Sequence, residues 1–158
     1  MLRTLSVALL LAPLAAGAEV RPFDVDDLVR LDRISDPQLS ADGTRLVYAL
    51  RQTDWDANKG VQSLWQLALD ERNAQPRRLT ATGSSAMHPR FAGDRLYFLS
   101  TRSGSAQVWV MDGPGEARAV TELPLDVGGF LLSPDGKRIA LALEVYPECG
   151  ADFACSQK

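Results

Sequence analysis

The sequence has 158 residues, 46% of them hydrophobic, and its 17 basic and 20 acidic side chains give a formal net charge of −3. This acidic balance argues against a nucleic-acid partner, because binding to phosphate backbones requires an excess of lysine and arginine. The composition is that of an ordinary globular domain without a low-complexity tract. The length of the chain suffices for one modest hydrophobic core.

The first eighteen residues (1–18) have the features of a secretory signal peptide. Arg3 provides a basic start, residues 5–16 are apolar, and Ala16-Gly17-Ala18 is a small-residue triplet that signal peptidase accepts. The apolar run contains Pro13 and is shorter than the roughly twenty residues of a membrane-spanning helix. We therefore expect a removable signal, no membrane span in the mature chain, and export to the periplasm or the medium.

A short helix is predicted at residues 24–30, within an N-terminal segment of residues 19–34. Val25, Leu28 and Val29 place apolar side chains on one helical face, and an acidic residue before them can cap free amide groups. We interpret this segment as a strap over the first sheet rather than as part of a ligand site.

A repeated pattern extends over most of the remaining chain. Each unit has a turn followed by a strand, then an apolar segment with a tryptophan, then an apolar residue followed by threonine. These landmarks are found at residues 39–48, 91–98 and 132–141, at 64–67 and 108–111, and at 78–80 and 119–121. They recur in the same order every 41 to 50 residues, which indicates a structural repeat.

Each unit is interpreted as four short antiparallel strands. Asp42-Gly43 and Asp135-Gly136 supply the positive-φ residue that a tight hairpin requires, and a strand pattern follows each turn. Four-stranded repeats of this length are typical of propeller blades, and a two-layer sandwich is the alternative. We predict an all-β fold at residues 35–158, an incomplete β-propeller with one short N-terminal helix. It comprises about two complete four-stranded blades and the start of a third, at about residues 35–82, 87–122 and 127–158.

Cys149 and Cys155 are the two cysteines of the sequence, with five residues between them. In an exported chain, a local disulfide is the favoured interpretation. The alternatives are two free thiols or pairing with a cysteine beyond Lys158. A metal site is not expected, because zinc requires four ligands and His88 is the only histidine.

The sequence contains no Gly-x-Ser-x-Gly pentapeptide, the turn on which an α/β-hydrolase presents its nucleophilic serine. The serines after Gly83 and Gly104 are interpreted as loop residues. His88 is the only candidate for an imidazole base, but Pro89 follows it and a blade's first strand is expected to begin just after it. We expect a structural or surface role for this histidine and no catalytic residues in the chain.

Cofactor and metal motifs are also incomplete. Residues 54–60 resemble a calcium loop, but Lys59 stands where the turn glycine belongs and Trp65 where the bidentate glutamate belongs. The glycines at 113 and 115 lack the lysine of a phosphate-binding loop. Trp65 and Trp109 occupy matching positions of the repeat, so we interpret them as packing residues. No metal-binding or cofactor-binding residue is predicted.

Residues 21–48, which join the expected helix, Ser35-Asp36-Pro37 and the first turn-strand unit, resemble the start of the prolyl oligopeptidase family of serine peptidases. They are most similar to the acylaminoacyl-peptidase and dipeptidyl-peptidase subgroup of bacterial periplasms. Residues 64–67, 78–80 and 132–137 resemble the propeller repeats of that family. The repeat strings also occur in binding propellers such as that of the Tol system.

The resemblance implies that the propeller is paired with a C-terminal α/β-hydrolase domain, which carries the catalytic serine, aspartate and histidine. No residue of this chain matches those three. We therefore expect the N-terminal propeller fragment of an exported serine peptidase, with that hydrolase domain and small peptides as partners. The alternatives are part of a non-catalytic periplasmic propeller that binds proteins, and a small secreted β protein that is complete in itself.

Overall fold

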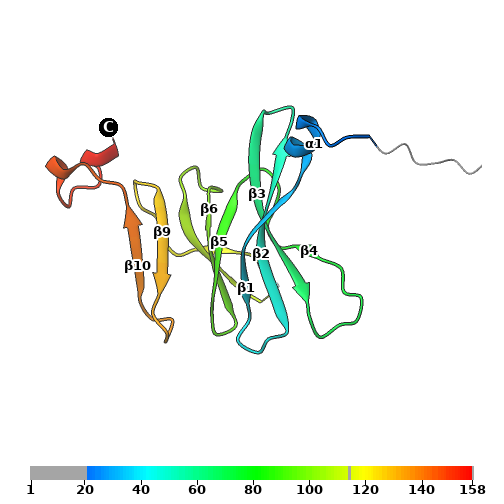
Figure 1. Ribbon diagram of the computed structural model, residues 1–158. Coiled ribbons are helices and arrows are strands. Elements are labelled where there is room, and N and C mark those ends of the chain that lie inside the picture. The colour runs from blue at the N-terminus through cyan, green and yellow to red at the C-terminus, as the bar shows by residue number, and fades with distance from the viewer. Residues whose placement is uncertain (1–20, 114, 158) are drawn as a thin grey trace, which may run out of the picture.

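The structure is a computed structural model that describes residues 21–113 and 115–157, so the signal predicted at residues 1–18 lies outside the described residues. One short α-helix is followed by strands that form three separate antiparallel sheets (Figure 1). The elements are α1 (Val25–Arg30), β1 (Arg33–Leu39), β2 (Arg45–Asp54), β3 (Lys59–Ala68), β4 (Arg77–Arg78), β5 (Ala86–Ala92), β6 (Arg95–Ser100), β7 (Gln107–Asp112), β8 (Arg118–Ala119), β9 (Val127–Leu132) and β10 (Ile139–Leu143). Two 3₁₀ turns follow, η1 (Pro147–Cys149) and η2 (Cys155–Gln157).

The predicted N-terminal helix is confirmed. Asp24 caps α1 by accepting a 3.0 Å hydrogen bond from the backbone amide of Asp27, whose side chain in return accepts from the Asp24 amide at 3.1 Å. This reciprocal capping satisfies two amides that a helix start leaves free. Arg21 forms an ion pair with Asp27, which lowers the pKa of that carboxyl group. The helix is tied to the first sheet where the Thr53 hydroxyl donates to the Val29 carbonyl at 3.0 Å.

The first and second sheets have the same topology. The first has strand order β1-β2-β3-β4 and the second β5-β6-β7-β8, so each is a meander in which sequential strands pair. The third sheet contains β9 and β10. In each sheet the pairing register of the first strand shifts once, between Ser35 and Gln38, between Met87 and Arg90, and opposite Ala142 and Leu143. The repeat found in the sequence is therefore also a repeat of backbone structure.

The turn between β1 and β2 explains why the repeat carries the pattern Ser-x-Asp-Gly. The Ser40 hydroxyl donates to Asp42 at 2.6 Å, and Asp42 also accepts from the backbone amide of Thr44 at 3.1 Å. Both hydrogen bonds favour the charged carboxylate and lower the pKa of Asp42 to about 2. Gly43 has a φ of 73°, a conformation that L side chains rarely adopt.

The third sheet repeats this turn. The Ser133 hydroxyl donates to Asp135, and this bond is the main reason that the pKa of Asp135 is lowered. Gly136 has a φ of 66°. The second sheet has Ala92-Gly93-Asp94 at this point, with Gly93 at a φ of 59°, and it lacks the serine. The turn is thus preserved even where its hydrogen-bonded side chains are not.

The hydrophobic core lies between the sheets rather than within any one of them. Successive residues of β6 point to opposite faces of the second sheet. Leu96 and Phe98 pack with residues of the first sheet such as Leu64, whereas Tyr97 and Leu99 pack toward the third sheet. The three sheets therefore stand in a row, and each packs its face against the face of the next, as Figure 1 shows. The prediction of a mostly β fold made of antiparallel sheets with one short helix is confirmed.

The fourth strand of each four-stranded sheet is short. The repeat predicts a fourth strand that ends in its apolar-threonine pair, but β4 and β8 have two residues each and end before Leu79-Thr80 and Val120-Thr121. The threonine side chains explain this difference. The Oγ1 atom of Thr80 accepts a hydrogen bond from the Leu64 amide at 3.1 Å, and Thr121 does the same for Val108 at 2.9 Å. A side chain thus takes the place of a ladder carbonyl.

The segment after β10 is closed by a disulfide. Cys149 and Cys155, in η1 and η2, are joined with their Cα atoms 5.6 Å apart. The buried hydroxyl of Ser156 accepts from the Tyr146 amide at 3.2 Å and holds the loop against its own start. In the part of the chain that the structure describes, no helix has the length and apolar character needed to cross a membrane.

Candidate functional site

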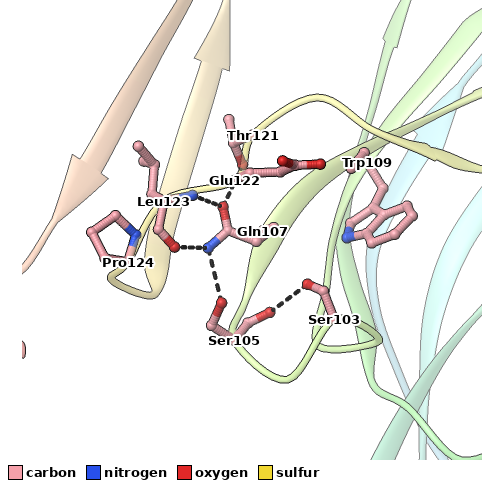
Figure 2. Close-up of a pocket in the computed structure, with 9 residues that line it drawn as sticks. Ser103, Ser105, Gln107, Trp109, Thr121, Glu122, Leu123 and Pro124 are labelled. Carbon is pink, nitrogen blue, oxygen red and sulfur yellow. Dashed lines mark hydrogen bonds between the residues drawn. The ribbon is translucent and has the colours of Figure 1, made fainter.

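One cavity lies at one end of the second sheet, where the β6–β7 hairpin meets the segment that leads to β9 (Figure 2). It has a volume of about 460 Å³. Its lining is mixed, with hydroxyl groups from Ser103, Ser105 and Thr121, a carboxylate from Glu122, and the apolar surface of Leu123. The cavity is large enough for a small polar molecule, but many polar groups that line it already form hydrogen bonds with other groups of the protein.

Gln107, at the start of β7, organises one wall of this cavity. Its side chain is 2% exposed. The Nε2 atom donates to the Leu123 carbonyl at 3.1 Å, to the Leu125 carbonyl at 3.0 Å and to the Ser105 hydroxyl at 3.0 Å. The Oε1 atom accepts from the Leu123 amide at 3.0 Å and from Thr121. Gln107 thus fixes the connection between the second and third sheets, which is a structural role.

The two repeat tryptophans differ in how their indole groups are satisfied. Trp65 donates from Nε1 to the Ser63 hydroxyl two residues earlier, at 3.0 Å. At the matching position before Trp109 stands Gln107, whose amide is committed to the connection described above. The Nε1 atom of Trp109 is buried and has no hydrogen-bond partner among the described residues. The Arg102 guanidinium lies 4.8 Å from the centre of the Trp109 ring. Trp109 also packs against the core between the first two sheets.

A second cavity, of about 280 Å³, lies where the first and second sheets meet. Asp36 in β1 and Arg90 in β5 line it and connect the two sheets. The Nη1 atom of Arg90 donates to both carboxylate oxygens of Asp36 at 2.8 Å and to the Pro89 carbonyl at 2.6 Å. Gln38 also donates to Asp36, at 3.1 Å. This is the best-defined polar contact between the two sheets.

His88 lines the same cavity and is exposed. The sequence placed this residue just before a strand, and this placement is wrong, because β5 begins at Ala86 and continues through it. The strand accommodates Pro89 by a local bulge, in which His88 adopts a φ of 53° and the pairing register shifts. Asp36, before Pro37, has a φ of 50° at the matching bulge of β1. Sequence reasoning missed that these two residues are structurally equivalent, although the shared x-Pro pair was visible.

The residues considered for catalysis do not come together. Ser84 and Ser85 precede β5 and Ser105 lies in the β6–β7 hairpin, whereas His88 lies in the cavity between the first two sheets. The suspected calcium loop is the β2–β3 hairpin, in which Asp54 accepts a 3.0 Å hydrogen bond from the Ala57 amide. Among residues 21–113 and 115–157, no group of three or more His, Cys, Asp or Glu side chains is arranged to hold a metal ion.

Two sheet faces at the ends of the row carry exposed apolar side chains. On the first sheet, the face turned away from the second includes Ile34 and Leu39, which are 66% and 56% exposed. They pair with Leu50 and Leu46 and therefore share a face with them. On the third sheet, Leu131 is 70% exposed on the face turned away from the second sheet. The residues around Leu131 form an open apolar groove of about 350 Å³.

No family model matches the chain. Among curated proteins, the chain is 31% identical over 124 residues to an uncharacterized peptidase of Bacillus subtilis called YuxL. The aligned region covers 76% of this chain and 19% of that protein. It is 34% identical over 118 residues to dipeptidyl-peptidase 5 of Porphyromonas gingivalis, covering 73% of this chain and 17% of that protein. The chain thus spans less than a fifth of the length of these curated relatives.

Several solved structures with a similar fold are peptidases. An acylaminoacyl peptidase of Pyrococcus horikoshii matches 72% of this chain and 17% of its own, at 20% identity and a TM-score of 0.58. The β-propeller domain of the Trilobed protease of Pyrococcus furiosus matches 70% of this chain and 33% of its own, at 16% identity and a TM-score of 0.51. At these identities the likeness concerns the fold, which is that of a propeller domain.

Proposed function

Because this chain is similar in sequence to peptidases and in fold to the propeller domains of the prolyl oligopeptidase family, we propose that it forms the opening part of the propeller of an exported serine peptidase. In this proposal the first and second sheets are two complete blades and the third sheet is the start of another. The propeller controls which peptides reach an α/β-hydrolase domain located elsewhere in a longer protein. Peptide hydrolysis is the activity of that longer protein.

The observation that carries the proposal is the pair of open apolar faces at the two ends of the row of sheets. Between the sheets, equivalent faces are covered: Val47 and Phe98 on opposite sides of the first interface are both fully buried. In a propeller each blade covers the apolar face of its neighbour. Side chains such as Ile34 and Leu131, at 66% and 70% exposure, are therefore explained if further blades pack on them.

The stacking of the sheets favours a propeller over a two-layer sandwich. A sandwich buries one face of each of two sheets against the other. Here the second sheet buries both faces, with Phe98 toward the first sheet and Leu99 toward the third. A sheet that is covered on both faces by successive sheets is the arrangement expected for a blade.

The test is to express the longer protein encoded by the same reading frame. We expect a Gly-x-Ser-x-Gly pentapeptide downstream, covalent labelling of its serine by a fluorophosphonate, and hydrolysis of short peptide anilides. Replacement of that serine by alanine should abolish both labelling and hydrolysis without changing expression. A reading frame that adds further blades but no such serine, and a product without hydrolysis, would instead indicate a non-catalytic binding propeller.

Export is part of the proposal. It is supported by the signal-like residues 1–18 and by the disulfide between Cys149 and Cys155, since such bonds persist in oxidising compartments. Sequencing the amino terminus of protein recovered from the periplasm or the medium should give a start near Glu19. Recovery from the cytosol with an intact amino terminus would contradict export without affecting the proposed peptidase function.

A further inference from the structure

The cavity between β1 and β5 combines two features that its packing role does not require. Asp36 and His88 hold equivalent positions in successive sheets, and each adopts a positive φ, of 50° and 53°, inside a strand. This conformation is unfavourable for a residue with a side chain, and both residues precede a proline. Both residues line the same cavity of about 280 Å³. The bulges therefore bring Asp36 and His88 to a single site.

Arg90 adds an oriented cation to this cavity. Its Nη1 atom makes the contacts with Asp36 and with the Pro89 carbonyl. Among the described residues, its Nε and Nη2 atoms have no hydrogen-bond partner, and its side chain is 34% exposed. The edge formed by Nε and Nη2 is the one that binds a carboxylate with two parallel hydrogen bonds. Asp36 thus fixes the guanidinium while leaving this edge free.

Hydrogen-bond geometry restricts the ligand of this cavity. Asp36 neutralises the single positive charge of Arg90, so net charge favours neither a monoanion nor a dianion, and the shape of the free guanidinium edge decides which anion fits. A planar monoanion matches the free guanidinium edge, and the His88 ring can donate one further hydrogen bond. Ser35 and Gln62, which also line the cavity, offer neutral polar groups for the remainder of a bound molecule.

We propose that Arg90, oriented by Asp36 and assisted by His88, binds the carboxylate of a peptide. The choice of a peptide rests on the function proposed above. The site joins β1 to β5, the strand through which the second sheet contacts the first, and in the proposed propeller both sheets would be blades arranged around a central channel. A peptide that passes along the channel would meet this site before it reaches the hydrolase domain.

The test uses the full 158-residue chain and the fact that His88 is its only histidine, so its ring signals in a proton NMR spectrum need no assignment. N-acetylglycine, a monocarboxylate, is titrated into the protein at constant pH, with N-acetylglycinamide as the matched neutral probe. We expect the His88 signals to shift and saturate with the acid and to remain unchanged with the amide. Equal shifts with both probes, or stronger binding of inorganic phosphate, would overturn the proposal.

Two variants separate the guanidinium edge from general charge. Arg90→Lys keeps the positive charge but loses the fork, so we expect N-acetylglycine to bind about tenfold more weakly. The control is Arg95→Lys, which changes an exposed arginine paired with Asp112 in the same sheet and should leave binding unchanged. His88→Asn, which tolerates positive φ, is monitored through the Arg90 Nε–H signal and should weaken binding while preserving the Asp36 contact. Equal affinity in the Arg90→Lys and parent proteins would refute the assignment.

The source of the carboxylate is resolved by a second probe. The α-methylamide of N-acetylaspartate presents a side-chain carboxylate, whereas N-acetylglycine presents a terminal one, and the tighter probe identifies the group that is read. In the longer protein, a preference for peptides with a free carboxylate over their amides should disappear in Arg90→Lys while hydrolysis of the amides continues. If the unsubstituted longer protein hydrolyses no peptide, the proposed peptidase function is contradicted. The NMR titration of the 158-residue chain still tests the carboxylate site in that case.

Discussion

The Thr121 hydroxyl donates a 2.7 Å hydrogen bond to the side-chain oxygen of Gln107 and at the same time accepts one from the Val108 amide. One threonine thereby connects the end of the second sheet to the residue that fixes the path to the third. Gln107→Leu keeps the volume of the side chain but leaves this hydroxyl and the Leu123 and Leu125 main-chain groups without partners. We expect the free energy of unfolding, measured with urea, to fall by about 2 to 3 kcal/mol.

The control for this variant is Gln52→Leu. Gln52 donates one exposed hydrogen bond to Asp32, at 3.0 Å, and water can replace it. Its loss should change the free energy of unfolding by less than about 0.5 kcal/mol. If Gln107→Leu costs no more than the control, the structural role assigned to Gln107 is incorrect.

The contact between Asp36 and Arg90 should stabilise the packing of the first sheet on the second. Because both side chains are partly buried, at 24% and 34% exposure, their coupling should exceed that of a surface ion pair. A double-mutant cycle with Asp36→Asn, which tolerates the positive φ, and Arg90→Met should give a coupling energy of about 1 kcal/mol in urea unfolding.

The pair Arg95 and Asp112 provides the comparison, since both side chains are more than half exposed and lie within the second sheet alone. The same cycle there should give about 0.3 kcal/mol, and 1 M salt should remove most of it. A coupling for Asp36 and Arg90 that is no larger than this would mean that the contact does not contribute to the packing of the two sheets.

Thr80 should matter through its hydroxyl rather than its shape. Thr80→Val is close in shape, but it leaves the amide of Leu64, a fully buried residue, without its acceptor. We expect a loss of about 1 to 2 kcal/mol in the free energy of unfolding and faster hydrogen exchange of the Leu64 amide. Thr53→Val is the control, because its hydroxyl donates to the Val29 carbonyl, a partly exposed contact that water can replace. Unchanged exchange of the Leu64 amide would contradict this account.

The fold was largely predictable because its signals are local and repeated. The turns at Asp42-Gly43 and Asp135-Gly136, the tryptophan strands and the capped helix each follow from short segments, and their order along the chain indicated propeller-like sheets. The resemblance to the prolyl oligopeptidase family is confirmed by peptidase relatives and by propeller neighbours, each matched over part of its length. The number of blades and the domain boundaries stay predictions.

The contacts between sheets could not be predicted, because they join residues far apart in the sequence. Nothing near Asp36 indicates that Arg90, 54 positions later, donates to it. The same holds for Gln107, which appears in the sequence as an ordinary polar residue at a strand start and is 2% exposed in the structure. The interpretation of His88 as a residue before a strand was wrong because a proline usually interrupts strand pairing, whereas here a bulge accommodates it.

The carboxylate of Asp42 should make the first hairpin sensitive to acid. Its pKa in the folded protein is about 2, against an ordinary value of 3.8, because the Ser40 hydroxyl and the Thr44 amide bind the charged form. A pKa lowered by folding stabilises the folded state above the unfolded pKa, and this contribution is lost as the pH falls from about 4 to about 2. In Ser40→Ala, the Asp42 pKa followed by carboxyl-carbon NMR should rise toward its ordinary value. The variant should be less stable than the parent at pH 7, and this difference should be smaller near pH 2, where the Asp42 carboxylate of the parent is also becoming protonated. A stability difference that is the same at both pH values would show that Ser40 acts through its bond to the Arg45 amide instead.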